Sequence, residues 1–123
     1  QVHLIPLLAP TSTDVRIARA CQMAGGFVYC ISLTGVTGAR QDLAQGVPAL
    51  SQRIRKHTSL PLALGFGISQ RHHVEALSPW ADAAVVGSAL IDLVERTPAG
   101  KRTEAAREFI AELGGATPTQ RRE

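Results

Sequence analysis

The chain has 123 residues, 45% hydrophobic, 19% charged and 4% aromatic, which suits one folded domain and excludes a disordered chain. Its net charge of +3 comes from scattered basic residues without interleaved aromatics, so we expect no nucleic-acid partner. We also expect a cytoplasmic protein, because there is no run of about 18 apolar residues, no signal-peptide pattern, and no cysteine besides Cys21 and Cys30.

In the first half of the chain, two short apolar runs are each followed by a helical pattern. Leu4–Ala9 is predicted to be a strand, and the Ser12–Thr13 pair offers an N-cap for the helix behind it. Phe27–Ser32 is predicted to be the second strand. Pro48 is favourable in the first turn of a helix, so the second helix is expected to begin there.

The second half repeats the alternation twice and adds one helix. Leu62–Phe66 and Ala83–Val86 are predicted strands, and Ser69 and Ser88 are expected to cap the helices that follow them. A final helix is predicted over Thr103–Leu113 from its apolar spacing. The uniformly apolar strands indicate a parallel sheet whose faces are covered.

Four strand–helix repeats predict an α/β fold with a parallel sheet, formed by one domain over residues 1–113 with a flexible tail over 114–123. Two architectures fit this pattern. One is a small doubly wound sheet, and the other is the (βα)4 half of a TIM (β/α)8 barrel. A complete barrel has about 250 residues, roughly twice the length of this chain.

Glycines follow three of the strands, where a parallel α/β protein binds its ligand. They lie in Thr34–Ala39, Gly65–Ser69 and Gly87–Ala89, and the last two blocks are read as strand–glycine–helix junctions. A helix start carries free N–H groups and partial positive charge, and glycine lets a ligand approach the backbone. The pattern predicts a phosphate site, although each glycine taken alone is also explained by a tight turn.

Five blocks of sequence together resemble the tryptophan synthase alpha chain family. The resemblance covers about residues 4–96, and the Thr-Gly-Val-Thr-Gly-Ala and Gly-Phe-Gly-Ile-Ser segments are its most specific parts. In chain order the blocks are Leu7–Asp14, Gly26–Tyr29, Ser32–Ala39, Leu62–Ser69 and Val86–Leu90.

The resemblance implies a (β/α)8 barrel that cleaves indole-3-glycerol phosphate to indole and glyceraldehyde 3-phosphate in tryptophan biosynthesis. It also implies that Tyr29 and Phe66 line the substrate pocket and that Thr37 lies on a loop that closes over the substrate. The residues that match the family's phosphate-binding groups are Gly38, Gly67, Gly87 and Ser88.

The family's two catalytic carboxylates, a glutamate and an aspartate, lie in its amino-terminal half, and this chain begins at what would be the fifth strand. No acidic residue here matches either of them. Positioned acid and base groups each contribute roughly 10²–10⁴-fold to a rate. We therefore expect the phosphate-binding half of the enzyme, with no catalytic residue and almost no activity on its own. The acidic residues compared are Asp14, Asp42, Glu75, Asp82, Asp92 and Glu95.

The resemblance also implies a partner, the pyridoxal phosphate-dependent beta chain of an α2β2 assembly, which receives the indole. The alpha chain itself is expected to use neither cofactor nor metal. Two alternatives stay open at this point. One is another sugar-phosphate barrel lyase or isomerase, and the other is an inactive phosphate-binding half-barrel that self-associates through open edges and an apolar face.

Several conspicuous residues are interpreted as structural. His72 and His73 are neighbours on a helix and point in different directions, so they are not expected to chelate a metal. Both cysteines are expected to pack in the core. Trp80 and Asp82 precede the fourth strand and are expected at the end of the barrel away from the chemistry.

Overall fold

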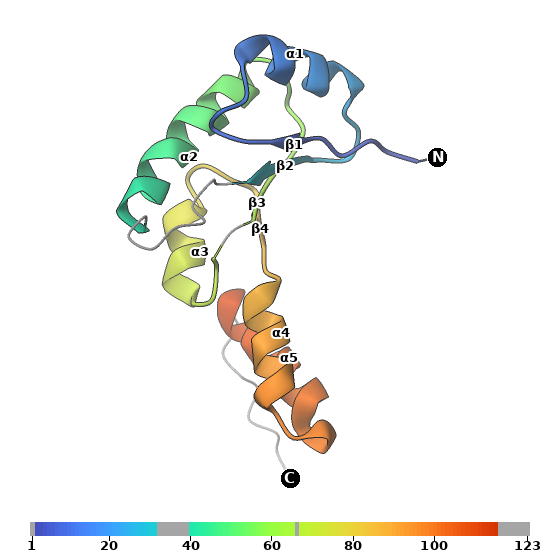
Figure 1. Ribbon diagram of the computed structural model, residues 1–123, viewed down its shortest axis with the longest axis vertical. Helices are drawn as coiled ribbons and strands as arrows, with labels where there is room; N and C mark the ends of the chain where they lie inside the picture. The colour runs from blue at the N-terminus through green and yellow to red at the C-terminus, as the bar shows by residue number, and fades with distance from the viewer. Residues whose placement is uncertain (1, 32–39, 66, 116–123) are drawn as a thin grey trace. The chain divides into compact units, whose positions relative to one another are not determined.

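The computed structural model describes residues 2–31, 40–65 and 67–115, with the backbone alone over residues 40–45 (Figure 1). Its contacts divide the chain into two compact units. The first unit is Gln1–Phe66 with Ala76–Val85, and the second is Gly67–Glu75 with Val86–Glu123.

The first unit contains a four-stranded parallel sheet in the order β1-β2-β3-β4. Crossovers between parallel strands are almost always right-handed, so an order that follows the chain puts every connecting helix on the same face. A doubly wound sheet would reverse direction at a switch point. Of the two predicted architectures, the strand order therefore matches the half-barrel and not the doubly wound sheet. The strands are β1 Leu7–Leu8, β2 Val28–Ile31, β3 Leu62–Gly65 and β4 Ala83–Val85.

Two helices of the first unit, α1 (Asp14–Met23) and α2 (Arg40–Arg55), pack against each other beside the sheet (Figure 1). Strand residues and one stripe of each helix form the core, and in β3 the consecutive residues Leu62, Ala63 and Leu64 are all buried. Both cysteines lie in it, which confirms the packing prediction. The buried residues of this unit are Leu8, Ala9, Ile17, Cys21, Val28, Cys30, Val47, Leu50, Ser51, Ile54, Leu62, Ala63, Leu64 and Leu77.

The predicted start of α1 is confirmed, whereas that of α2 is wrong. Thr13 caps α1, and its Oγ1 accepts the N–H of Arg16 at 3.3 Å. The second helix begins at Arg40, so Pro48 lies in its interior. An interior proline removes one backbone hydrogen bond and clashes with the preceding turn. The apolar stripe that includes Val47 and Ile54, 3% and 0% exposed, offsets this cost by holding the helix against the sheet.

The second unit is helical. α4 (Ser88–Arg96) packs against α5 (Arg102–Leu113), and the 3₁₀ turn η1 (Ala99–Lys101) joins them. The residues of helix α3 (Arg71–Leu77) are divided between the units, with those up to Glu75 in the second and the last two in the first. Within the second unit, Arg71 donates from Nη1 to the carbonyl of Leu113 at 2.8 Å, which places a cation at the C-terminal end of α5.

Both serine caps predicted in this half of the chain are wrong. Ser88 is the first residue of α4 and Gly87 is its N-cap, because the Gly87 carbonyl already accepts the N–H groups of Leu90 and Ile91 at 3.0 and 3.1 Å. Ser69 lies two residues before the start of α3. Its backbone N–H donates to a side chain of that helix.

The single domain over residues 1–113 stays a prediction, and residues 116–123 of the predicted tail lie outside the described residues. Among the helices that the structure describes, none is long and apolar enough to cross a membrane.

Candidate functional site

Two glycines extend the carboxyl ends of neighbouring strands. Gly65 and Val85 are paired in the β3–β4 ladder, and Gly67 and Gly87 each follow two residues later. Gly67 has a φ of +45°, in the left-handed region, whereas Gly87 has a φ of −124°. Both are exposed, and no described atom lies within 4 Å of where a Cβ would stand on either. A ligand can therefore reach the backbone at both positions.

Gly87 opens α4, a helix of nine residues. In any α-helix the first N–H groups have no partner within the helix, so those of Ser88 and Ala89 are available as donors. The helix dipole adds partial positive charge at the same point. Of the two predicted strand–glycine–helix junctions, this one is confirmed. Gly67 is not at a helix start, since α3 begins at Arg71.

The loop after Gly67 is anchored inside the second unit. Ile68 is 3% exposed, and the N–H of Ser69 donates to Nδ1 of His73 at 3.2 Å. Arg71 lies between Glu75, whose Oε1 is 2.9 Å from its Nε, and the end of α5. These contacts hold the loop while leaving Gly67 itself open.

The adjacent histidines contact each other. The rings of His72 and His73 meet edge to face, with centroids 4.2 Å apart. No group of three metal-ligating side chains occurs in the part of the chain that the structure describes.

Tyr29 lies on β2 in the first unit, and its ring fills the space beside Gly65. A Cβ on Gly65 would stand 2.0 Å from the Tyr29 hydroxyl oxygen and 2.6 Å from Cζ. Gly65 therefore leaves the room that this ring occupies. Sequence reasoning missed the contact, although a glycine inside a strand is a known signal of close approach by another group.

The remaining predicted site residues, Thr37, Gly38 and Phe66, lie outside the described residues. Of the others, Gly67, Gly87 and Ser88 belong to the second unit and Tyr29 to the first.

Two aspartates are held by arginines. Oδ1 of Asp14 is 2.7 Å from Nε of Arg53, which lowers the pKa of that carboxyl group. Asp82 accepts the N–H of Leu62 at 2.8 Å and a hydrogen bond from Arg55, and both lower its pKa. A general acid must hold its proton near neutral pH, so neither group suits that role. The structural role predicted for Asp82 is confirmed.

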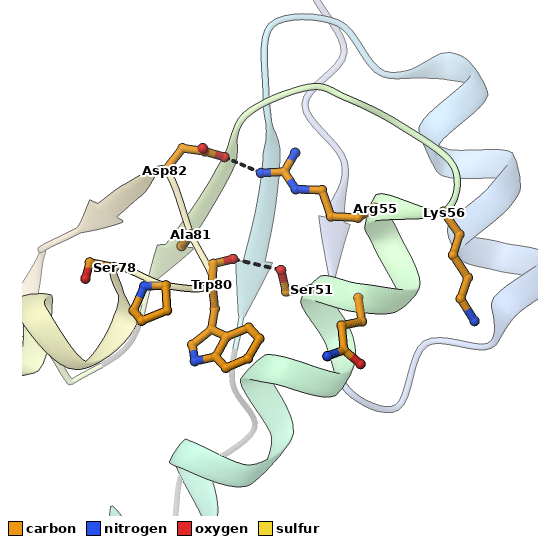
Figure 2. Close-up of a pocket in the computed structure, with 9 residues that line it drawn as sticks. Ser51, Arg55, Lys56, Ser78, Trp80, Ala81 and Asp82 are labelled. Carbon is orange, nitrogen blue, oxygen red and sulfur yellow. Dashed lines mark hydrogen bonds and ion pairs between the residues drawn. The ribbon is translucent and has the colours of Figure 1, made fainter.

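A cavity of about 470 Å³ lies at the amino ends of β3 and β4 (Figure 2). Figure 2 shows Arg55 directed toward Asp82, and Ser51 donating to the Trp80 carbonyl at 2.8 Å. In (β/α)8 barrels this end contributes to stability, whereas the chemistry lies at the carboxyl ends. The predicted site residues Gly67 and Gly87 instead follow the carboxyl ends of β3 and β4. The cavity is lined by Ser51, Gln52, Arg55, Lys56, Ser78, Pro79, Trp80, Ala81 and Asp82.

Comparison with known proteins gives one consistent result. A family model described as "Tryptophan synthase alpha chain" matches residues 1–117. A curated relative of that name from Roseiflexus castenholzii is 50% identical over 114 residues, which cover 93% of this chain and 44% of the relative. Another, from Methanocaldococcus jannaschii, is 45% identical over 95 residues, which cover 77% of this chain and 34% of the relative.

Solved structures agree with the sequence comparison. The tryptophan synthase A-subunit from Pyrococcus furiosus has a TM-score of 0.76 and 32% identity, with 93% of this chain and 45% of that chain covered. A structure of the tryptophan synthase a2b2 complex from the same organism has a TM-score of 0.78 and 35% identity, with 93% and 46% covered. The chain thus spans less than half the length of these relatives.

Proposed function

This chain belongs to the tryptophan synthase alpha chain family, and we propose that it supplies the phosphate-binding half of a lyase barrel. The reaction is the retro-aldol cleavage of indole-3-glycerol phosphate to indole and glyceraldehyde 3-phosphate. The proposed phosphate-binding residues are Gly38, Gly67, Gly87 and Ser88.

The observation that carries the proposal is the open backbone at Gly87. Neither a positive φ nor a neighbouring described atom requires a glycine there. The open backbone lets a ligand approach, and the helix start behind it attracts an anion. Gly67 adds a second open position in the same compact unit. Hydrogen bonds to charged groups contribute about 1.5–3 kcal/mol each, so a few backbone donors hold a phosphoester without a lysine or arginine.

The substrate's indole end is proposed to lie against Tyr29 and Phe66. Tyr29 is half-buried on the sheet face opposite the core residues of β2, which suits an aromatic group that lines a barrel interior. Thr37 is proposed to lie on the loop that closes over the bound substrate. Such closure excludes water and completes the site.

The catalytic acid and base are proposed to come from outside this chain. The cleavage needs one group to protonate the indole ring at C3 and another to take the proton of the substrate hydroxyl. The lowered pKa values of Asp14 and Asp82, both paired with arginines, support this proposal. So does the chain's coverage of 44% of its Roseiflexus relative.

The proposed partner is the beta chain of an α2β2 assembly, to which this chain would pass indole. Its similarity to a chain in a solved tryptophan synthase a2b2 complex supports the proposal. Pyridoxal phosphate would belong to the beta chain, and this chain would carry no cofactor of its own.

Calorimetric titration with glycerol 3-phosphate tests the phosphate site. We expect Gly87→Ala to weaken binding at least tenfold without changing stability, because its Cβ enters open space in the free protein. Gly100→Ala, also next to open space but on η1, is the matched control and should bind normally. Unchanged affinity in Gly87→Ala would remove the proposed site.

A further inference from the structure

The cavity at the amino ends of β3 and β4 plays no part in the proposed function. Its volume of about 470 Å³ is within the usual range for small-molecule sites, about 300–1,000 Å³. One wall is the end of α2, and the other is the segment Ser78–Asp82, which joins α3 to β4 (Figure 2). Both walls belong to the first unit, so the cavity lies within one compact unit.

Hydrogen bonds connect the two walls. Ser51, which is 8% exposed, donates from Oγ to the Trp80 carbonyl at 2.8 Å. One turn further along α2, Arg55 donates to Asp82, whose Oδ2 also accepts the N–H of Leu62 at 2.8 Å. A site that is formed before its ligand arrives loses less conformational entropy on binding. The cavity is therefore suited to bind a ligand without rearranging its walls.

Trp80 separates the cavity from the core. Its side chain is half-buried, and it also lines a narrow space beside the core residues Cys30 and Leu50 that is too small for a water molecule. Pro79 and Ala81 line the cavity next to it. An aromatic side chain provides a flat apolar surface against which another ring packs. Trp80 therefore favours a ligand with an aromatic group.

The α2 wall supplies the charge of the cavity. Lys56 directly follows α2, one turn after Gln52, and both side chains are exposed. Neither has a hydrogen bond or an ion pair with another residue that the structure describes. Because Arg55 and Asp82 neutralise each other, Lys56 gives the cavity one positive charge in excess. A carboxylate is attracted to that charge and accepts hydrogen bonds from both Lys56 and Gln52.

We propose that this cavity binds a small aromatic carboxylate, with its ring against Trp80 and its carboxylate at Lys56 and Gln52. A neutral aromatic compound would leave the lysine charge unpaired, and a simple anion would leave the indole without a partner. The inference does not depend on the proposed function, because none of these three residues belongs to the proposed phosphate site.

NMR titration with benzoate tests the proposal. Trp80 is the only tryptophan of the chain, so its indole N–H gives a single signal that reports on the cavity. We expect benzoate to shift this signal until the site is saturated. Benzyl alcohol has the ring without the charge, and acetate has the charge without the ring. Each should bind about threefold more weakly than benzoate, or weaker still.

Lys56→Gln removes the positive charge at an exposed position, so the chain should fold normally and bind benzoate about threefold more weakly. Lys101→Gln makes the same change on η1 in the second unit and is the matched control, which should bind benzoate normally.

A benzoate titration that does not saturate would overturn the proposal. So would equal affinity for benzyl alcohol or acetate, or a Lys56→Gln variant that binds benzoate as tightly as the unaltered chain. None of these readouts involves Gly87, so failure here leaves the calorimetric test of the proposed function unaffected.

Discussion

Three glycines near the strand ends have different physical reasons to be glycine. Gly65 makes room for the ring of Tyr29, and Gly67 adopts a φ of +45° that other residues rarely tolerate. Gly87 has neither constraint within the fold. A substitution therefore affects packing at Gly65, the backbone at Gly67 and the approach of a ligand at Gly87.

We predict that Gly65→Ala destabilises the chain by about 1–3 kcal/mol, the usual cost of forcing an extra carbon into a packed site. The added Cβ would stand 2.0 Å from the Tyr29 hydroxyl oxygen, so the ring must move. Urea unfolding of the single variants and of the double variant with Tyr29→Ala measures the coupling. The cost of Gly65→Ala should shrink in the Tyr29→Ala background, and an equal cost in both backgrounds would contradict the contact.

At the scale of elements, sequence reasoning predicted the order of strands and helices but not all their starts. The apolar runs and the Thr13 cap are local signals, and β2, β3, β4 and α1 form where these indicate. Pro48 misled the prediction because its preference for a first turn is also local. The helix α2 stays continuous at the proline because the apolar stripe that includes Val47 and Ile54 is buried against the sheet. That packing is a non-local contact, which a local signal does not contain.

Pro48→Ala tests where α2 begins. In the structure the proline lies inside the helix, so alanine should stabilise the chain, by about 1–3 kcal/mol on the scale of interior helix propensities. Chemical denaturation with the helical content followed by circular dichroism measures the change. A loss of stability, or none, would instead favour a helix that begins at Pro48.

At the scale of the whole molecule, the features of the proposed site that could be predicted were those carried by residues consecutive in the sequence. The glycine blocks predict a phosphate site after the strands, which stays a prediction, whereas the family resemblance is confirmed by the match over residues 1–117. The contacts of Arg55 with Asp82 and of Arg71 with Leu113 were not foreseen. Each joins residues at least 27 positions apart, and no local pattern encodes such a pairing.

We predict that phosphate binding and acid–base chemistry belong to different halves of the barrel. The most direct measurement is indole release from indole-3-glycerol phosphate, by this chain alone and after mixing with the amino-terminal half of the Roseiflexus castenholzii relative, with that half also assayed alone as the control. We expect no indole above background from the chain alone and clear release from the mixture. Indole released by the chain alone would contradict the account, because its own carboxylates would then perform the chemistry.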